Sequence, residues 1–110
     1  ESFDAALHNW TFVIRQVRFF EAERLYKGNP TRADIVKHCS GLKELITIGE
    51  KIVGEAERQP GCLSGKNTNL ANLKAIVSGL EFSLEEWSRP AAADPENLED
   101  LRRKIFCVEG

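Results

Sequence analysis

The stretch that decides the fold is FDAALHNWTFVIRQVRFF, residues 3–20, because apolar side chains recur in it at alternating steps of three and four residues. This ladder consists of Phe3, Ala6, Trp10, Val13, Val17 and Phe20. Such steps keep side chains on one stripe of a helix, and their mean of about 3.5 residues is typical of helices that supercoil around partners. The stretch therefore predicts an amphipathic helix that packs lengthwise against other helices.

Two further ladders follow with the same spacing. One consists of Ile35, His38, Leu42, Leu45, Gly49, Ile52 and Ala56, and the other of Leu70, Leu73, Val77, Leu80, Leu84 and Trp87. Gly28-Asn29-Pro30 ends the first helix, Pro60-Gly61 ends the second, and Thr31 and Asn67 or Thr68 are candidate N-caps. We predict helices over residues 3–27, 31–58 and 67–88. The short loops between them predict antiparallel neighbours.

A fourth, shorter ladder lies near the C-terminus. Residues 90–94 form a Pro/Ala-rich hinge, in which Asp94 can cap a helix whose first residue is Pro95. Leu98, Leu101, Ile105 and Val108 then make one apolar stripe over residues 95–108. So short a helix is marginal in water on its own, so we expect it to pack on the bundle or on another molecule. The predicted fold class is all-α: an antiparallel three-helix, left-handed coiled-coil bundle over residues 1–89, followed by this C-terminal fourth helix.

Length and charge limit the function classes. A chain of 110 residues is long enough for one domain with its own core. A net charge of -2 and a pI near 5.7 argue against nucleic-acid binding through phosphate contacts. No apolar run approaches the roughly 18 residues that direct membrane insertion requires, and we expect a cytoplasmic protein. The absence of methionine suggests a piece cut from a longer chain.

The residues that could carry chemistry do not form a recognisable site. Cys39, Cys62 and Cys107 are odd in number and widely spaced, which fits neither a disulfide framework nor a zinc site. His38 lies on the second ladder, with no acid or second histidine at helical spacing to complete a ligand set or a catalytic pair. We therefore expect no catalytic, cofactor-binding or metal-binding residues and no cofactor, and we interpret His38 as a hydrogen-bonded core residue.

The ladders also predict which side chains form the core. The expected core residues are Trp10, Val13, Val17, Phe20, His38, Leu42, Leu45, Ile52, Leu73, Val77, Leu80, Leu84 and Trp87. We expect Trp10 and Trp87 to be buried on mutually facing sides of the first and third helices. Gly49 and Gly54 are each expected to weaken the second helix by roughly 1 kcal/mol relative to alanine.

A second aromatic stripe lies off the main ladder of the first helix. Phe12, Phe19 and Tyr26 recur at seven-residue spacing. In a three-helix bundle each helix faces two others, so this stripe is either additional core or an exposed protein-binding face. The candidate partner-binding residues are Phe12, Phe19, Tyr26, Leu98, Leu101 and Ile105.

Residues 3–89 resemble a spectrin-type repeat. The marks of that family are a tryptophan midway along the first helix, a Lys-His pair in the second and a tryptophan late in the third, and here they correspond to Trp10, Lys37-His38 and Trp87. Leu45 and Ile52 follow the histidine at one and two heptads. The resemblance implies a left-handed three-helix coiled coil. Pro90 interrupts the third helix where tandem repeats run on, which favours a terminal or isolated repeat.

The resemblance implies a non-enzymatic function. Repeats of this type act as spacers and docking modules in larger cytoskeletal or scaffold proteins, so the expected partners are other proteins, including cytoskeletal ones, with no nucleic acid and no membrane insertion. The alternative is a free-standing four-helix bundle that binds a small ligand or regulates a single protein partner, with residues 95–108 closing the bundle. The sequence leaves the oligomeric state open.

Overall fold

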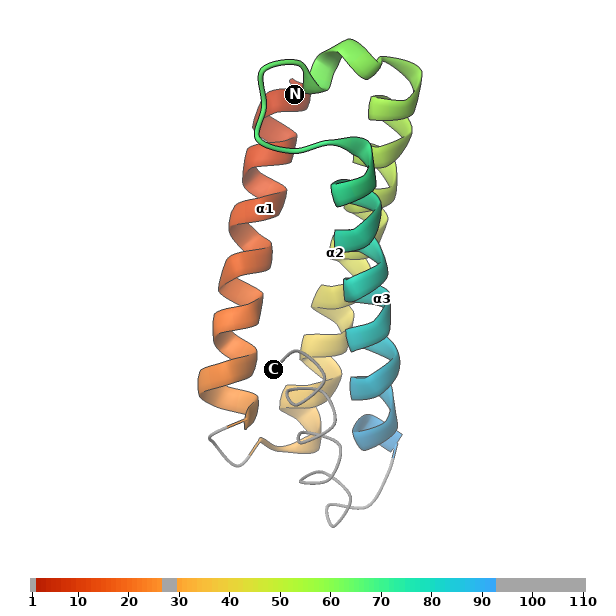
Figure 1. The fold of residues 1–110 in the computed structure, drawn as a ribbon. Coiled ribbons are helices and arrows are strands. Elements are labelled where there is room, and N and C mark those ends of the chain that lie inside the picture. Colours follow the sequence, from red (N-terminus) through yellow and green to blue (C-terminus); the bar gives the residue numbers. More distant parts are fainter. Residues whose placement is uncertain (1, 27–29, 93–110) are drawn as a thin grey trace.

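The computed structural model describes residues 2–26 and 30–92, and three long helices make up most of this part of the chain (Figure 1). They are α1 (Phe3–Phe20), α2 (Arg32–Arg58) and α3 (Leu70–Ala92). A π-helix, η1 (Glu21–Tyr26), continues α1, and a short 3-10 helix, η2 (Pro60–Leu63), follows α2. Each long helix runs opposite to the one before it (Figure 1). The predicted all-helical bundle is confirmed for the described residues.

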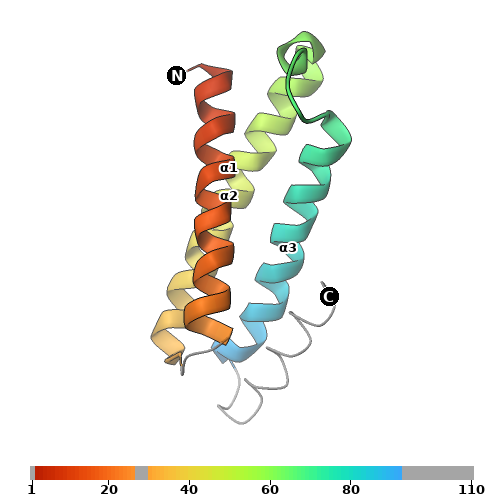
Figure 2. The same cartoon turned by 60° about the vertical axis from the view of Figure 1, so that its left-hand side comes forward.

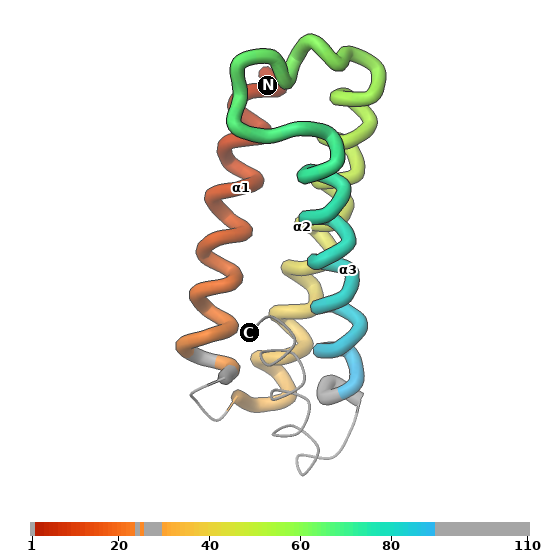
Figure 3. The backbone as a smooth tube through the Cα atoms, viewed as in Figure 1, coloured from red at the N-terminus to blue at the C-terminus, as the bar shows by residue number. Residues whose placement is uncertain are grey.

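The second helix holds the bundle together. Among the pairs of helices, α2 and α3 make the most extensive contact, and α1 packs mainly against α2 (Figures 2 and 3). α2 accordingly supplies the largest share of the core: its buried residues are Ile35, His38, Cys39, Leu42, Leu45, Ile46, Gly49, Ile52 and Ala56. α1 buries only Leu7 and Trp10. The core therefore lies along α2, and α1 is the least covered of the three helices.

Local hydrogen bonds set the helix starts. The Thr31 hydroxyl accepts from the Asp34 N–H at 3.1 Å, and the Asp34 carboxylate accepts from the Thr31 N–H at 3.0 Å. This capping box satisfies two of the free N–H groups at the start of α2. The third helix begins at Leu70, not at residue 67, because the Asn69 side chain, rather than Asn67 or Thr68, accepts from the Asn72 N–H at 2.9 Å.

Two helix ends differ from the prediction. The segment expected to complete the first α-helix up to residue 27 is instead the π-helix η1, a rare conformation that is often found near functional sites. α3 continues through Pro90 to Ala92, although we expected the hinge to begin at residue 90. A proline near a helix end removes only one i→i−4 hydrogen bond, and the alanines that follow favour helix. The rest of the hinge and the predicted helix over residues 95–108 lie outside the described residues.

Trp10 and Trp87 are both buried, with 2% and 0% of their surface exposed, but they do not face each other. α1 and α3 run in the same direction, and Arg18 of α1 meets Ser83 of α3 through a hydrogen bond of 2.7 Å. Trp10 is eight residues before Arg18 and Trp87 four residues after Ser83, so the two indoles differ in level by about 18 Å. Each tryptophan packs on α2 instead, at a different height.

Gly49 and Gly54 have different roles in α2. A Cβ atom at Gly49 would lie 2.6 Å from Cζ2 of Trp10 and 2.8 Å from Cγ2 of Val77, so α2 can approach both neighbours only where it has no side chain. At Gly54 the nearest atom is the mobile end of Arg58, at 3.6 Å. From the sequence, both glycines were expected only to weaken the helix. In the structure, the close packing of α2 on Trp10 and Val77 requires glycine at position 49.

This contrast predicts opposite effects of alanine at the two positions. Gly49→Ala should lower the free energy of unfolding by about 1–3 kcal/mol, because the methyl group overpacks a rigid buried ring. Gly54→Ala, the matched control, should raise it by up to about 1 kcal/mol through helix propensity. Urea denaturation of both variants measures the difference, and a stabilised Gly49→Ala variant would contradict the close contact.

Burial of the indole predicts a large effect of removing it. Trp10→Ala should lower the free energy of unfolding by about 3–5 kcal/mol, since a buried aromatic ring is lost and a cavity is left beside Gly49. Urea denaturation followed by circular dichroism checks this value. Native fluorescence gives an independent check, because an emission maximum typical of fully hydrated tryptophan would be inconsistent with burial of both indoles.

Candidate functional site

A buried polar network joins all three helices near the end of α1. It consists of Arg18, Glu21, His38 and Ser83. The Glu21 carboxylate lies 2.7 Å from Nε2 of His38 and 3.0 Å from Nη1 of Arg18. The same Arg18 nitrogen donates to the Ser83 hydroxyl at 2.7 Å. The network therefore links α1 and η1 to α2 through His38 and to α3 through Ser83.

The network keeps a negative charge inside the bundle. Only 2% of the Glu21 side chain and 3% of the His38 side chain are exposed. Burial by itself raises the pKa of Glu21, but the hydrogen bond from His38 and the charge and hydrogen bond of Arg18 outweigh it and leave the pKa below its ordinary value. Glu21 is thus an ionised acceptor, and Nε2 of His38 must carry the hydrogen that it donates.

Two aromatic rings enclose the imidazole. The ring of Phe20 lies 5.8 Å from that of His38, and the indole of Trp87 meets His38 edge-on, at 5.9 Å and 88°. Nε1 of Trp87 is buried and has no hydrogen-bond partner among the described residues. His38 is therefore held on one side by a carboxylate and on two others by rings, which fixes its orientation.

The imidazole of the network is covered by its neighbours. A histidine hydrogen-bonded to a carboxylate can act as a base that is oriented by an acid, but it needs a reacting group within reach. Here the ring is enclosed by Phe20, Trp87 and Glu21. His38 is the hydrogen-bonded core residue that the second ladder predicted, whereas its partner was missed. Glu21 lies four residues after Val17 on the same stripe, and this ladder position was the only available signal.

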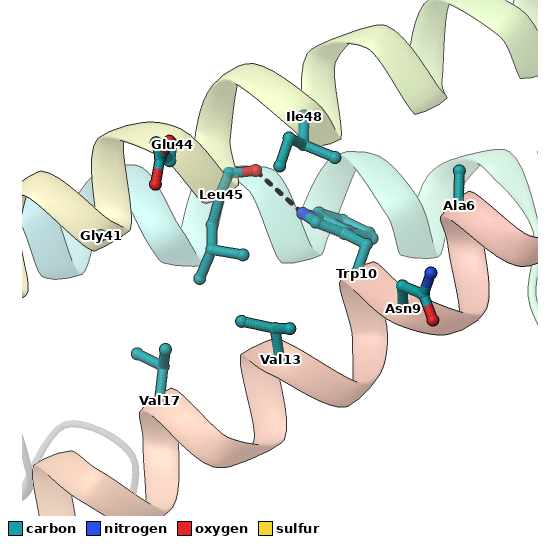
Figure 4. A pocket seen from close by; sticks show the side chains of 9 residues that line it. All are labelled: Ala6, Asn9, Trp10, Val13, Val17, Gly41, Glu44, Leu45 and Ile48. Carbon is teal, nitrogen blue, oxygen red and sulfur yellow. Dashed lines mark hydrogen bonds between the residues drawn. The ribbon is translucent and has the colours of Figure 1, made fainter. Parts of the chain in front are cut away.

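An apolar groove lies between α1 and α2 (Figure 4). It has a volume of about 350 Å³ and is lined by Ala6, Asn9, Trp10, Val13, Val17, Gly41, Glu44, Leu45 and Ile48. Nε1 of Trp10 donates a 2.8 Å hydrogen bond to the Leu45 carbonyl oxygen beside it. We call this hollow the α1–α2 groove. Its walls are almost entirely hydrocarbon, with Asn9 and Glu44 as the polar exceptions.

The core prediction was wrong for Val13 and Phe20, which are 39% and 38% exposed. Val13 borders the groove, where α2 offers Gly41 instead of a large side chain. Phe20 lies seven residues further along the same side of α1, beyond the residues that line the groove. Val17 and Leu84 are half-buried against the core. The other predicted core residues are buried: Trp10, His38, Leu42, Leu45, Ile52, Leu73, Val77, Leu80 and Trp87.

The second aromatic stripe lies on the surface. Phe12 is 52% exposed and Phe19 is 67% exposed, so of the two interpretations left open by the sequence the structure favours the exposed face. The third member, Tyr26, is in η1, but its side chain lies outside the described part of the chain. Leu98, Leu101 and Ile105 also lie outside it.

The described cysteines are free thiols. Cys39 is buried and Cys62 is half-buried, and burial raises the pKa of the Cys39 thiol. A raised pKa makes a thiol less reactive, because the thiolate is the nucleophile. Cys107 lies outside the described residues. Within residues 2–26 and 30–92, no group of three or more histidine, cysteine and acidic side chains could hold a metal ion.

Among the described helices, none is both long enough and apolar enough to cross a membrane. Comparison of the chain with protein-family models, with curated proteins and with solved structures found no match. The case for function therefore depends on the geometry of the chain itself.

The buried carboxylate predicts a specific pH dependence. Glu21→Gln should lower the free energy of unfolding at neutral pH by about 1.5–3 kcal/mol, since it removes the charged acceptor of His38 and Arg18. The folded pKa lies below the ordinary value of 4.5, so the stabilisation is complete above that value and is lost as the pH falls through the folded pKa. Urea titrations should therefore show the two proteins converging as the pH falls below 4.5.

The matched control is Glu85→Gln, which removes an acid whose side chain is 72% exposed and which pairs with Arg89 at 3.6 Å. A surface ion pair of this kind contributes about 0–1 kcal/mol, so the effect should be small at every pH. A difference between the wild type and Glu21→Gln that stays constant from neutral to acid pH would show that Glu21 is not ionised in the folded protein.

Proposed function

We propose that this chain is a non-enzymatic helical spacer and protein-docking module of the spectrin-repeat type, belonging to a larger cytoplasmic scaffold or cytoskeletal protein. The proposal includes the left-handed supercoil that the ladder spacing of about 3.5 residues favours, and a fourth helix over residues 95–108. Its partners would be other proteins.

The observation that carries the proposal is where the chain enters and leaves the bundle. The molecule measures 48 × 27 × 20 Å, and the start of α1 and the end of α3 lie at opposite ends of the long dimension (Figure 1). An elongated module with this connection can follow another in series and separate whatever flanks it. The proposed fourth helix has about half the length of α2, so a chain that turned back along the bundle there would not return to the end at which it began.

The docking role is supported by the aromatic face of α1. Phe12 and Phe19 are seven residues apart on one side of the helix, and both are largely exposed. Large aromatic side chains are enriched at protein interfaces, where they bury much area with little loss of side-chain freedom. Arg15 and Gln16, between them, are exposed polar residues that can form hydrogen bonds at the edge of such an interface. We call this surface the Phe12–Phe19 face.

The polar network supports the non-enzymatic part of the proposal. Its charged and polar groups satisfy one another between three helices, and its histidine is covered by rings. An arrangement of this kind holds helices in register. Within the described part of the chain, only 3% of the His38 side chain is exposed, which leaves a substrate no open position at the imidazole.

Removing the aromatic rings tests the docking role. Phe12→Ser combined with Phe19→Ser should change the free energy of unfolding by no more than about 0.5 kcal/mol per site, because both rings are mainly in water. The doubly substituted chain should nevertheless lose proteins that the wild-type chain retains from a cell extract, as measured by quantitative mass spectrometry. Val36→Ser, which changes a 48%-exposed residue of α2, is the control and should retain them.

Equal retention by the wild type and the double variant would exclude the Phe12–Phe19 face as a docking surface. If the wild type retains no protein but its melting temperature rises with a small apolar compound, the chain is a ligand-binding bundle instead.

A further inference from the structure

The α1–α2 groove leaves apolar surface in water that neither described helix can cover. Val13 and Ile48, on opposite sides of it, are 39% and 42% exposed, and Trp10 forms part of its wall. At one end of the groove Gly41 has no side chain, and a Cβ atom placed there would meet nothing within 4 Å. It is also on a different side of α1 from Phe12 and Phe19, so its occupant need not be the partner proposed above.

We propose that residues 95–108 of this same chain pack as a helix into the α1–α2 groove, with Leu98, Leu101 and Ile105 against the exposed edge of α1.

Chain connectivity permits this placement. α3 ends at the same end of the bundle as α1 (Figure 3). Residues 93–97 can span up to about 17 Å when extended, which is enough to pass from one helix of a bundle to the space between its neighbours. A helix that then turns back along the bundle runs antiparallel to α1 and parallel to α2.

The apolar stripe of the segment fits the length of the exposed edge. Leu98 and Ile105 are seven residues apart, as are Phe20 and Val13, and seven helical residues rise roughly 10 Å. In the antiparallel direction Leu98 would meet Phe20, and Ile105 would meet Val13. Phe20 and Val13 are the two ladder residues of α1 that the described structure leaves exposed. The uncovered ladder positions and the apolar stripe of the segment therefore match in length.

The charges agree with the same direction. On α2, Lys37 and Glu44 are both exposed and lie on the stripe that contains Gly41 and Ile48, with Lys37 nearer the end of the bundle at which α3 finishes. In the segment, acidic Glu96, Glu99 and Asp100 come first, and basic Arg102, Arg103 and Lys104 come after them. A helix parallel to α2 brings the acidic part toward Lys37 and the basic part toward Glu44. The reverse direction would place like charges together.

A spin label on Cys107 tests where the segment lies in the full chain. The protein carries Cys62→Ser, and buried Cys39 stays unlabelled. If Ile105 meets Val13, the label lies near the groove, and the amide signals of Val13 and Ile48 should lose much more intensity than those of Ala75 and Ser78, which are exposed on α3. No selective loss at the groove, or a greater loss on α3, would overturn the proposal.

Mixing experiments separate this occupant from a second copy. Isotope-labelled protein without the spin label is mixed with spin-labelled protein without the isotope. Selective broadening at the groove that persists in the mixture comes from another molecule and would also overturn the proposal. Broadening confined to the doubly labelled chain supports it.

Charge reversal gives a second, independent test. Arg102 and Lys104 flank the apolar stripe of the segment, whereas Arg103 lies on the opposite side of the helix. Glu44→Lys should lower the melting temperature, and adding Arg102→Glu together with Lys104→Glu should restore most of the loss, because the reversed charges attract again. Glu50→Lys, on another exposed part of α2, is the control and should not respond to these two changes. Failure of Arg102→Glu with Lys104→Glu to rescue Glu44→Lys more than Glu50→Lys would overturn packing in the proposed direction.

Discussion

The buried carboxylate of Glu21 is the centre of a hydrogen-bond network that links all three helices at one end of the bundle. Glu21 stays ionised in the interior because His38 of α2 donates to it and Arg18 pairs with it, and Arg18 also donates to Ser83 of α3. An unpaired carboxylate at this depth would be strongly destabilising, so the position of each helix end is tied to the others. The π-helix starts at this residue, which places the unusual backbone at the point where all three helices are linked.

A second fixed contact lies further along α1 and explains why a groove exists. The Trp10 indole reaches the Leu45 carbonyl and occupies the space that the missing side chain of Gly49 leaves. α1 is thus held against α2 at two levels, by Trp10 and by Glu21. Between these levels the facing residues are Val13 and Val17 on α1 and Gly41 on α2, which are too small to fill the interval. The hollow follows from where the two contacts are and from the small residues between them.

The apolar ladders were sufficient to predict three antiparallel helices and most of the core, because burial of one stripe per helix follows from spacing alone. They could not predict Glu21 as the partner of His38, since the two side chains meet only after the helices pack. They also assigned Val13 and Phe20 to the core, although both side chains are exposed. The spacing of a ladder shows which side chains share one side of a helix, but it does not show how many of them a neighbouring helix covers. The start of α3 at Leu70 depended on which of several polar residues caps it, and Asn69 does so.

The unequal coverage of α1 separates its surfaces into two kinds. Phe12 and Phe19 project from the outer side of the helix, where they can meet a flat or concave surface of another molecule. Val13 borders the α1–α2 groove, where only something narrow enough to lie between two helices can reach it. A helix is such an object, and its side chains fill grooves by the same ridge-and-groove geometry that packs α2 on α3. Helix α1 can therefore contact another segment of its own chain through the groove and another protein through the Phe12–Phe19 face. The two contacts use different residues, so they do not compete.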